Sequence, residues 1–73
     1  MPHKNNSPFP RGARVEIPVH YDMWMRGART GTVGEYRRGR HGQSAYVLAH
    51  MDHRSVTKPL KLWEPDWEYA KLL

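Results

Sequence analysis

Alternating polar and apolar residues predict three short strands in the N-terminal part of this 73-residue chain. Residues 14–17 have the period of two that is typical of a half-buried strand, and Pro18 ends it because proline cannot donate a hydrogen bond to a neighbouring strand. Residues 30–36 and 44–51 form the next two strands. The third strand has one face of Ala45, Val47, Ala49 and Met51, and another with Tyr46 and Leu48.

Two further strands are predicted towards the C-terminus. The alternation resumes over residues 56–62, although Pro59 restricts this run to an edge strand or a bulge. Residues 64–67 are predicted to form one tight turn, since proline is favoured at its second position. Residues 68–73 then form the last strand. The rough helical spacing of apolar residues over 62–73 leaves an amphipathic helix as the alternative.

Glycines mark the predicted turns. Residues 18–29 form a long loop, and Gly27 and Gly31 supply a positive φ or a close backbone approach where this loop becomes a strand. Residues 37–42 form the basic tip of a hairpin between two strands. We expect substitution of the two tip glycines to cost less stability than substitution of Gly31, because a mobile tip can adjust.

The N-terminal residues 1–10 contain three prolines, two asparagines and a serine, with only Phe9 to bury. This composition predicts a flexible, disordered tail, in which Phe9 folds back as an anchor just before the first strand. Trp24 is too large to leave wholly in water, and we expect it to plug one end of the core.

Five short strands, a long first loop, a basic hairpin and a one-turn connector predict an all-β fold, a small five-stranded antiparallel barrel over residues 11–73. The chain resembles the SH3-like barrels, and among them the KOW-type modules of ribosomal proteins and transcription elongation factors. Four stretches carry this resemblance: residues 12–17, 27–33, 46–47 and 60–67. The early end of the first strand at Pro18 and the loop of residues 20–25 depart from that pattern. Residues 17–33 are also similar to small uncharacterised phage and prophage proteins, which implies no known activity.

The composition limits how this domain is stabilised and where it works. A core of this size rarely supplies more than about 3–5 kcal/mol, and the absence of cysteine excludes disulfides and thiolate metal ligands. The longest apolar run, residues 45–49, is far shorter than the ~20 residues of a membrane-spanning helix. No apolar segment follows Lys4, so no secretory signal is predicted and a cytoplasmic setting is expected.

Positive charge is concentrated in the middle of the chain. The formal net charge is +5, and residues 26–61 carry eight basic side chains against two acidic ones, whereas residues 62–73 have a net charge of −2. A basic middle favours a polyanionic partner, and solubility alone is the other explanation for these arginines. In KOW modules a similar basic hairpin often touches RNA, so the resemblance implies contact with nucleic acid.

Arginines near aromatic rings are the pattern expected of a protein that pairs phosphates and stacks bases. RNA or DNA is therefore the first partner hypothesis. Tyr46 and Trp24 could also stack bases, but only if their rings are not buried in the core. The candidate nucleic-acid-binding residues are Arg26, Arg29, Tyr36, Arg37, Arg38, Arg40 and Lys58.

A protein partner is the second hypothesis, and it would fit a phage accessory protein that docks onto a host factor. The aromatic loop would make the contact, with its methionines as adaptable anchors. Exposure of Trp24 and Met25 would favour this hypothesis, and their burial would favour the basic face. The candidate protein-binding residues are Tyr21, Met23, Trp24 and Met25.

Catalytic and metal sites are not predicted. No serine has a matched histidine and carboxylate at a recognisable spacing, and no glycine run resembles a phosphate-binding loop, so we expect no enzyme and no cofactor. His50 and His53 flank Asp52, and His20 is a distant third imidazole. On a strand His50 and His53 point to opposite faces, so ordinary surface histidines are expected rather than metal ligands.

Overall fold

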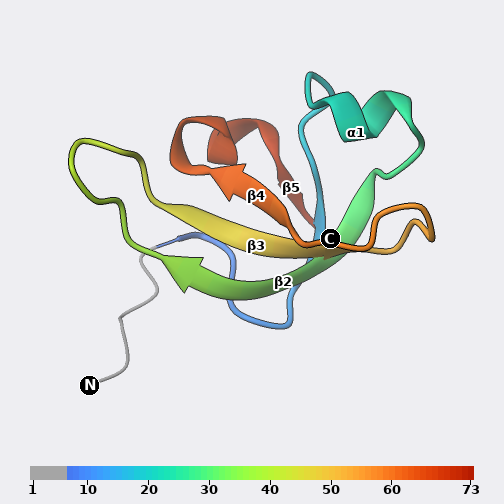
Figure 1. Ribbon diagram of the computed structural model, residues 1–73. Coiled ribbons are helices and arrows are strands. Elements are labelled where there is room, and N and C mark those ends of the chain that lie inside the picture. The colour runs from blue at the N-terminus through green and yellow to red at the C-terminus, as the bar shows by residue number, and fades with distance from the viewer. Residues whose placement is uncertain (1–6) are drawn as a thin grey trace.

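A computed structural model describes residues 7–73, so most of the predicted tail, residues 1–6, lies outside the described residues. Within that range the chain forms an antiparallel sheet and two short helices, α1 and the 3-10 helix η1 (Figure 1). The predicted all-β fold is confirmed. In chain order the elements are β1 (Arg14–Glu16), α1 (Asp22–Met25), β2 (Thr30–Arg37), β3 (Tyr46–Met51), β4 (Leu60–Trp63), η1 (Glu64–Tyr69) and β5 (Lys71–Leu72).

The sheet has five strands in the order β4-β3-β2-β1-β5, so β4 and β5 are its two edges. Neither edge pairs with the other in the described part of the chain, and the predicted closure into a barrel is therefore wrong. Near the C-terminus η1 takes up six residues, and the two residues of β5 pair with β1 and not with β4. The five strands and their antiparallel pairing are as predicted.

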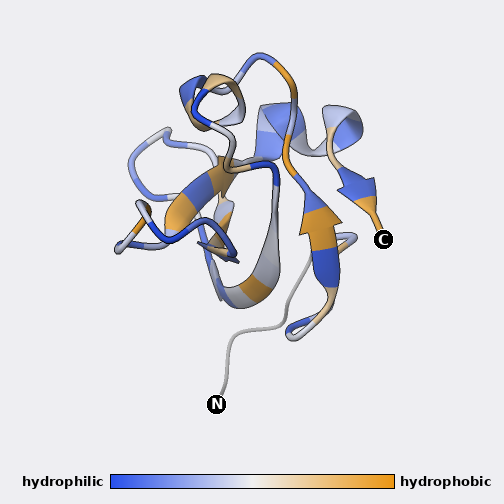
Figure 2. Ribbon diagram, turned by 90° about the vertical axis from the view of Figure 1, so that its right-hand side faces the viewer, coloured by the Kyte–Doolittle hydropathy of each residue, from blue (hydrophilic) through white to orange (hydrophobic). Residues whose placement is uncertain are grey.

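Hydrophobic and hydrophilic residues alternate along the strands (Figure 2), and the buried hydrophobic residues form one core. Phe9 is only 3% exposed and packs edge-on against Trp67, with 6.4 Å between ring centroids, so the predicted anchor is confirmed. Because the chain has no cysteine, this small core has to stabilise the fold without disulfides. The buried cluster consists of Phe9, Val15, Val33, Val47, Ala49 and Leu62.

The long loop between β1 and β2 contains α1, which the sequence did not predict. None of the residues of α1 is buried, so the prediction that Trp24 plugs the core is wrong. Trp24 is half-buried instead, and the guanidinium of Arg29 lies 4.8 Å from its ring centroid. A cation stacked over the ring shields it from water without placing it in the core.

Two glycines allow backbone segments to approach closely. A Cβ on Gly31 would lie 2.8 Å from the carbonyl oxygen of His50, which confirms the close approach predicted there. A Cβ on Gly39 would overlap the carbonyl oxygen of Gln43. The hairpin tip is therefore closely packed at Gly39, so a substitution there is expected to cost stability as one at Gly31 does.

The C-terminal elements are shorter than predicted. β4 begins immediately after Pro59, so residues 56–59 form a loop rather than the start of a strand. The predicted turn at 64–67 extends into η1, where Pro65 occupies the first turn of the helix as its fixed φ favours. The indole Nε1 of Trp67 donates to the carbonyl oxygen of Leu62 at 2.9 Å. η1 and the two-residue β5 therefore form where the sequence predicted a strand over residues 68–73 or, as the alternative, a helix over residues 62–73.

Candidate binding surfaces

The hairpin between β2 and β3 presents three of the predicted arginines together. Arg37, Arg38 and Arg40 line a pocket of about 350 Å³, which Tyr46 also lines. Arg37 pairs with Glu35 at 3.0 Å, whereas Arg38 and Arg40 are exposed and form no ion pair within residues 7–73. Free guanidinium groups with this fork geometry are well suited to phosphate.

An aromatic pair lies beside this pocket on the outer face of β3 and β4. Tyr46 and Trp63 are opposite each other in the two strands, and their ring centroids are 4.9 Å apart. The ammonium group of Lys61 lies 5.2 Å from the Tyr46 centroid and 5.8 Å from the Trp63 centroid. Both rings are half-buried, so each is accessible at the surface. We refer to these three residues as the aromatic platform.

Tyr36 does not join the arginines as predicted. The pairing of β2 with β3 shifts between Val33, which faces Ala49, and Tyr36, which faces Val47. This irregularity places Tyr36 on the core side, where it packs against the buried cluster with its ring 6.5 Å from that of Trp67.

The other predicted basic residues lie at the opposite end of the sheet. Arg26 and Arg29 follow α1, and Lys58 is in the loop between β3 and β4. Both loops project from the end away from the β2–β3 hairpin (Figure 1). The predicted nucleic-acid site is thus divided into two groups, and the structure brings together only the three hairpin arginines.

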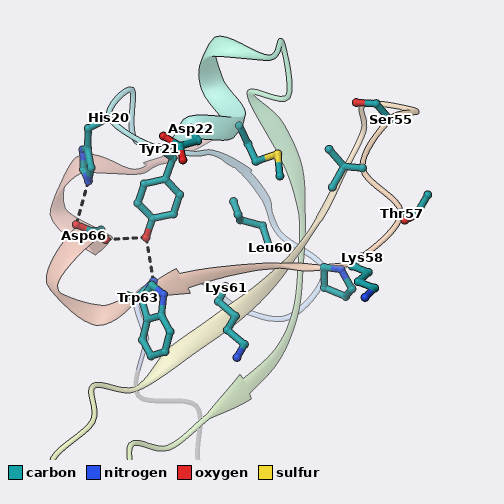
Figure 3. A pocket seen from close by; sticks show the side chains of 13 residues that line it. His20, Tyr21, Asp22, Ser55, Thr57, Lys58, Leu60, Lys61, Trp63 and Asp66 are labelled. Atoms are coloured by element: carbon teal, nitrogen blue, oxygen red, sulfur yellow. Dashed lines mark hydrogen bonds and ion pairs between the residues drawn. The ribbon is translucent and has the colours of Figure 1, made fainter.

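A groove of about 740 Å³ runs between α1, the β3–β4 loop and the free edge of β4. Its apolar lining includes Met23, Val56 and Leu60, and its lysines are Lys58 and Lys61 (Figure 3). An apolar lining with a few polar groups is typical of ligand-binding sites.

One wall of the groove is held by a polar network. The hydroxyl of Tyr21 donates to Asp66 Oδ2 at 2.7 Å and accepts from the backbone N–H of Trp63 at 3.2 Å. His20 Nε2 lies 3.1 Å from Asp66 Oδ1 (Figure 3). Burial raises the pKa of Tyr21 well above its usual range, and the hydrogen bond to Asp66 adds to the rise. Tyr21 is therefore held in place by two hydrogen bonds.

The predicted protein-binding residues are also divided. Tyr21 and Met23 line the groove, whereas Trp24 and Met25 do not. Met25 is 84% exposed on α1. The loop therefore presents two separate apolar surfaces rather than one.

The histidines and carboxylates do not converge on a metal site. Among residues 7–73 there is no group of three or more ligating side chains that could hold a metal ion. His53 Nδ1 contacts Ser55 Oγ at 2.6 Å, and Asp52 binds Arg14 and Thr30. In the same residues no helix is long and apolar enough to span a membrane.

Comparisons with protein families, curated proteins and solved structures gave no match. The resemblance to SH3-like barrels and KOW-type modules therefore stays a prediction, as do the activities that it implies.

Sequence reasoning missed Lys61 and Trp63 as surface residues beside Tyr46. Their position depends on the register of β4 against β3, in which Tyr46 faces Trp63 and Leu48 faces Lys61. The available signal was the alternation Leu60-Lys61-Leu62-Trp63, which places Lys61 and Trp63 together on the face opposite the two leucines.

Proposed function

We propose that this protein acts by binding nucleic acid, without catalysis, through the hairpin arginines and the aromatic platform. The observation that carries this proposal is the arrangement of Tyr46. Its ring lines the arginine pocket on one side and pairs with Trp63, under Lys61, on the other. Cations for phosphates and rings for bases thus form one continuous surface.

Both parts of this surface have a role in recognising a nucleic acid. Base stacking on aromatic side chains contributes about 1–3 kcal/mol per base and is tolerant of sequence. The arginines supply charge, and each phosphate contact releases condensed counterions. The absence of ion-pair partners for Arg38 and Arg40 within residues 7–73 means that binding need not break existing contacts.

Salt dependence tests the proposal. Neutralising Arg37, Arg38 and Arg40 to alanine should reduce the magnitude of the logarithmic salt slope by about two to three units, as counterion release predicts. Fluorescence anisotropy with labelled single-stranded and duplex oligonucleotides, from low to physiological salt, measures it. The matched control replaces Arg26, Arg29 and Arg54 with alanine, where Arg54 lies in the loop between β3 and β4. It removes the same charge from the other end of the sheet. An equal loss of slope in both variants, or no binding at low salt, contradicts the proposal.

A protein-interaction module is the second candidate, and the 84% exposure of Met25 favours it. Exposed methionine adapts to different apolar partners. Association through this loop would be insensitive to salt, and Trp24→Ala or Met25→Ala would disrupt it while the arginine variants would not.

A further inference from the structure

We propose that the ligand is single-stranded and that the groove beside β4 holds one of its bases, next to bases stacked on the aromatic platform. This inference rests on the proposed function and extends it to the class of nucleic acid and to a second binding site.

The free edge of β4 gives the groove open backbone groups. Glu64 N–H donates to the carbonyl oxygen of Ala45 at 2.9 Å, which makes these residues a hydrogen-bonded pair. Because such pairs alternate along an antiparallel ladder, Leu62 also directs its backbone towards β3, while Lys61 and Trp63 direct theirs outward. The N–H of Trp63 is taken by the Tyr21 hydroxyl. The N–H and carbonyl of Lys61 remain as a donor and an acceptor for a ligand.

The groove has the size and walls of a site for a planar, partly polar group. Its volume of about 740 Å³ lies within the ~300–1,000 Å³ usual for small-molecule sites. Met23, Val56 and Leu60 supply apolar contacts, and Tyr21 is fixed by two hydrogen bonds. A wall that is held before binding reduces the entropy lost on binding.

The groove is continuous with the aromatic platform. Lys61 and Trp63 line the groove and also belong to the platform, and they extend from β4 on the side away from Leu60 (Figure 3). A strand that stacks on Tyr46 and Trp63 would therefore pass the edge of β4 directly into the groove. Lys58 and Lys61 line this path and would pair with its phosphates. The lining also holds two carboxylates, Asp22 and Asp66, and the oxygens of Asp66 are taken by Tyr21 and His20.

Base pairing excludes a duplex from this surface. The platform and the groove need bases with a free ring face and free edges, and in a duplex stacking and pairing occupy both. The arginine pocket alone would bind a duplex, through its backbone, with no contribution from the groove.

The decisive experiment places a charge in the groove. Val56→Asp should weaken binding of a labelled dT or U 12-mer by about fivefold or more, the loss of one stacked base. Val19→Asp is the matched control, because Val19 is 66% exposed and does not line the groove. Lys58→Ala and Lys71→Ala form a second matched pair, one inside the groove and one on β5. Thermal melting confirms that each variant folds.

Titration of the unchanged protein with uridine monophosphate provides a test without mutation. Amide resonances of residues 56–61 and 21–23 should shift in two-dimensional NMR spectra. Equal affinities of Val56→Asp and Val19→Asp for the 12-mers, or no shifts in the groove, overturn the groove assignment and leave an apolar peptide as its occupant. A duplex that binds as tightly as the single strands overturns the single-strand assignment. Failure of the groove assignment can be told apart from failure of the proposed function. If the proposed function is wrong, Trp63→Ala and the alanine variant of the three hairpin arginines also leave binding of the 12-mers unchanged.

Discussion

Gly31 and Gly34 lie on the same strand, β2, and both are buried, yet they meet different neighbours. A Cβ at Gly31 would lie 2.8 Å from the backbone oxygen of His50, whereas a Cβ at Gly34 would lie 2.7 Å from the imidazole of the same residue. The backbone oxygen is fixed by the pairing of β2 with β3, but the exposed imidazole can rotate away. At the scale of single residues, the loss of stability on adding a methyl group depends on whether a backbone atom or a surface side chain has to move.

Gly31→Ala should therefore destabilise the protein by about 1–3 kcal/mol, the usual range for overpacking. Gly34→Ala should cost less, because only a surface side chain is displaced. Urea denaturation followed by tryptophan fluorescence gives both free energies of unfolding. Equal costs at the two positions would show that the separation of β2 and β3 is not limited by the His50 backbone.

Asp52 makes the stability of the protein sensitive to acid. Its hydrogen bonds to Arg14 and Thr30 lower the pKa of this carboxyl from 3.8 to about 2. A lowered folded-state pKa means that the unfolded chain takes up the proton first, so the stabilising effect is complete above pH 3.8 and is lost as the pH falls towards 2. The melting temperature should fall in that interval less steeply for Asp52→Asn than for the unchanged protein. Parallel pH profiles would contradict this assignment.

At the scale of elements, alternation was sufficient to predict the interior strands. β1, β2 and β3 each have one buried face, and each begins and ends at or close to the residues predicted from the sequence. α1 could not be predicted in this way, because four residues are too few to show a helical period. η1 and the two residues of β5 are also too short for a period to appear. Their limits are set by packing, such as that of Trp67 against Phe9 and Tyr36.

The candidate site was predictable only where it is local in sequence. The hairpin arginines lie within four residues of one another, and their grouping followed directly from the turn between two strands. The aromatic platform joins residues 17 positions apart through the β3–β4 register, and the irregular pairing of β2 moves Tyr36 to the core face. The alternation over residues 60–63 shows that Lys61 and Trp63 share a face, but neither the register that brings them beside Tyr46 nor the irregularity of β2 has a signal in a single sequence.

The strand order predicts which elements open last. β2 is the middle strand and β3 is flanked on both sides, whereas β5 pairs over two residues at an edge. Amide hydrogen exchange measured by NMR should therefore be slowest in β2 and β3 and fastest in β5. Protection of residues 71–72 equal to that of 46–51 would contradict the order.

At the scale of the whole molecule, the small core makes each large buried side chain important. Phe9 is 3% exposed and precedes the first strand, yet it packs in the same cluster as residues of β1, β2, β3 and β4. Truncating a buried phenylalanine to alanine costs about 3–5 kcal/mol. A core of this size supplies about the same amount. One residue therefore decides whether the domain is folded.

Phe9→Ala should leave much of the protein unfolded at 25 °C, with loss of the cooperative thermal transition in circular dichroism. Phe9→Leu keeps an apolar side chain of similar size at this position and should remain folded with a lower melting temperature. Tyr69→Ala is the matched control for removing an aromatic ring, because Tyr69 is 59% exposed, and it should change the melting temperature little. A cooperative transition for Phe9→Ala close to that of Tyr69→Ala would mean that the sheet and η1 are stable without this anchor, and that Trp67 alone covers the open side of the core.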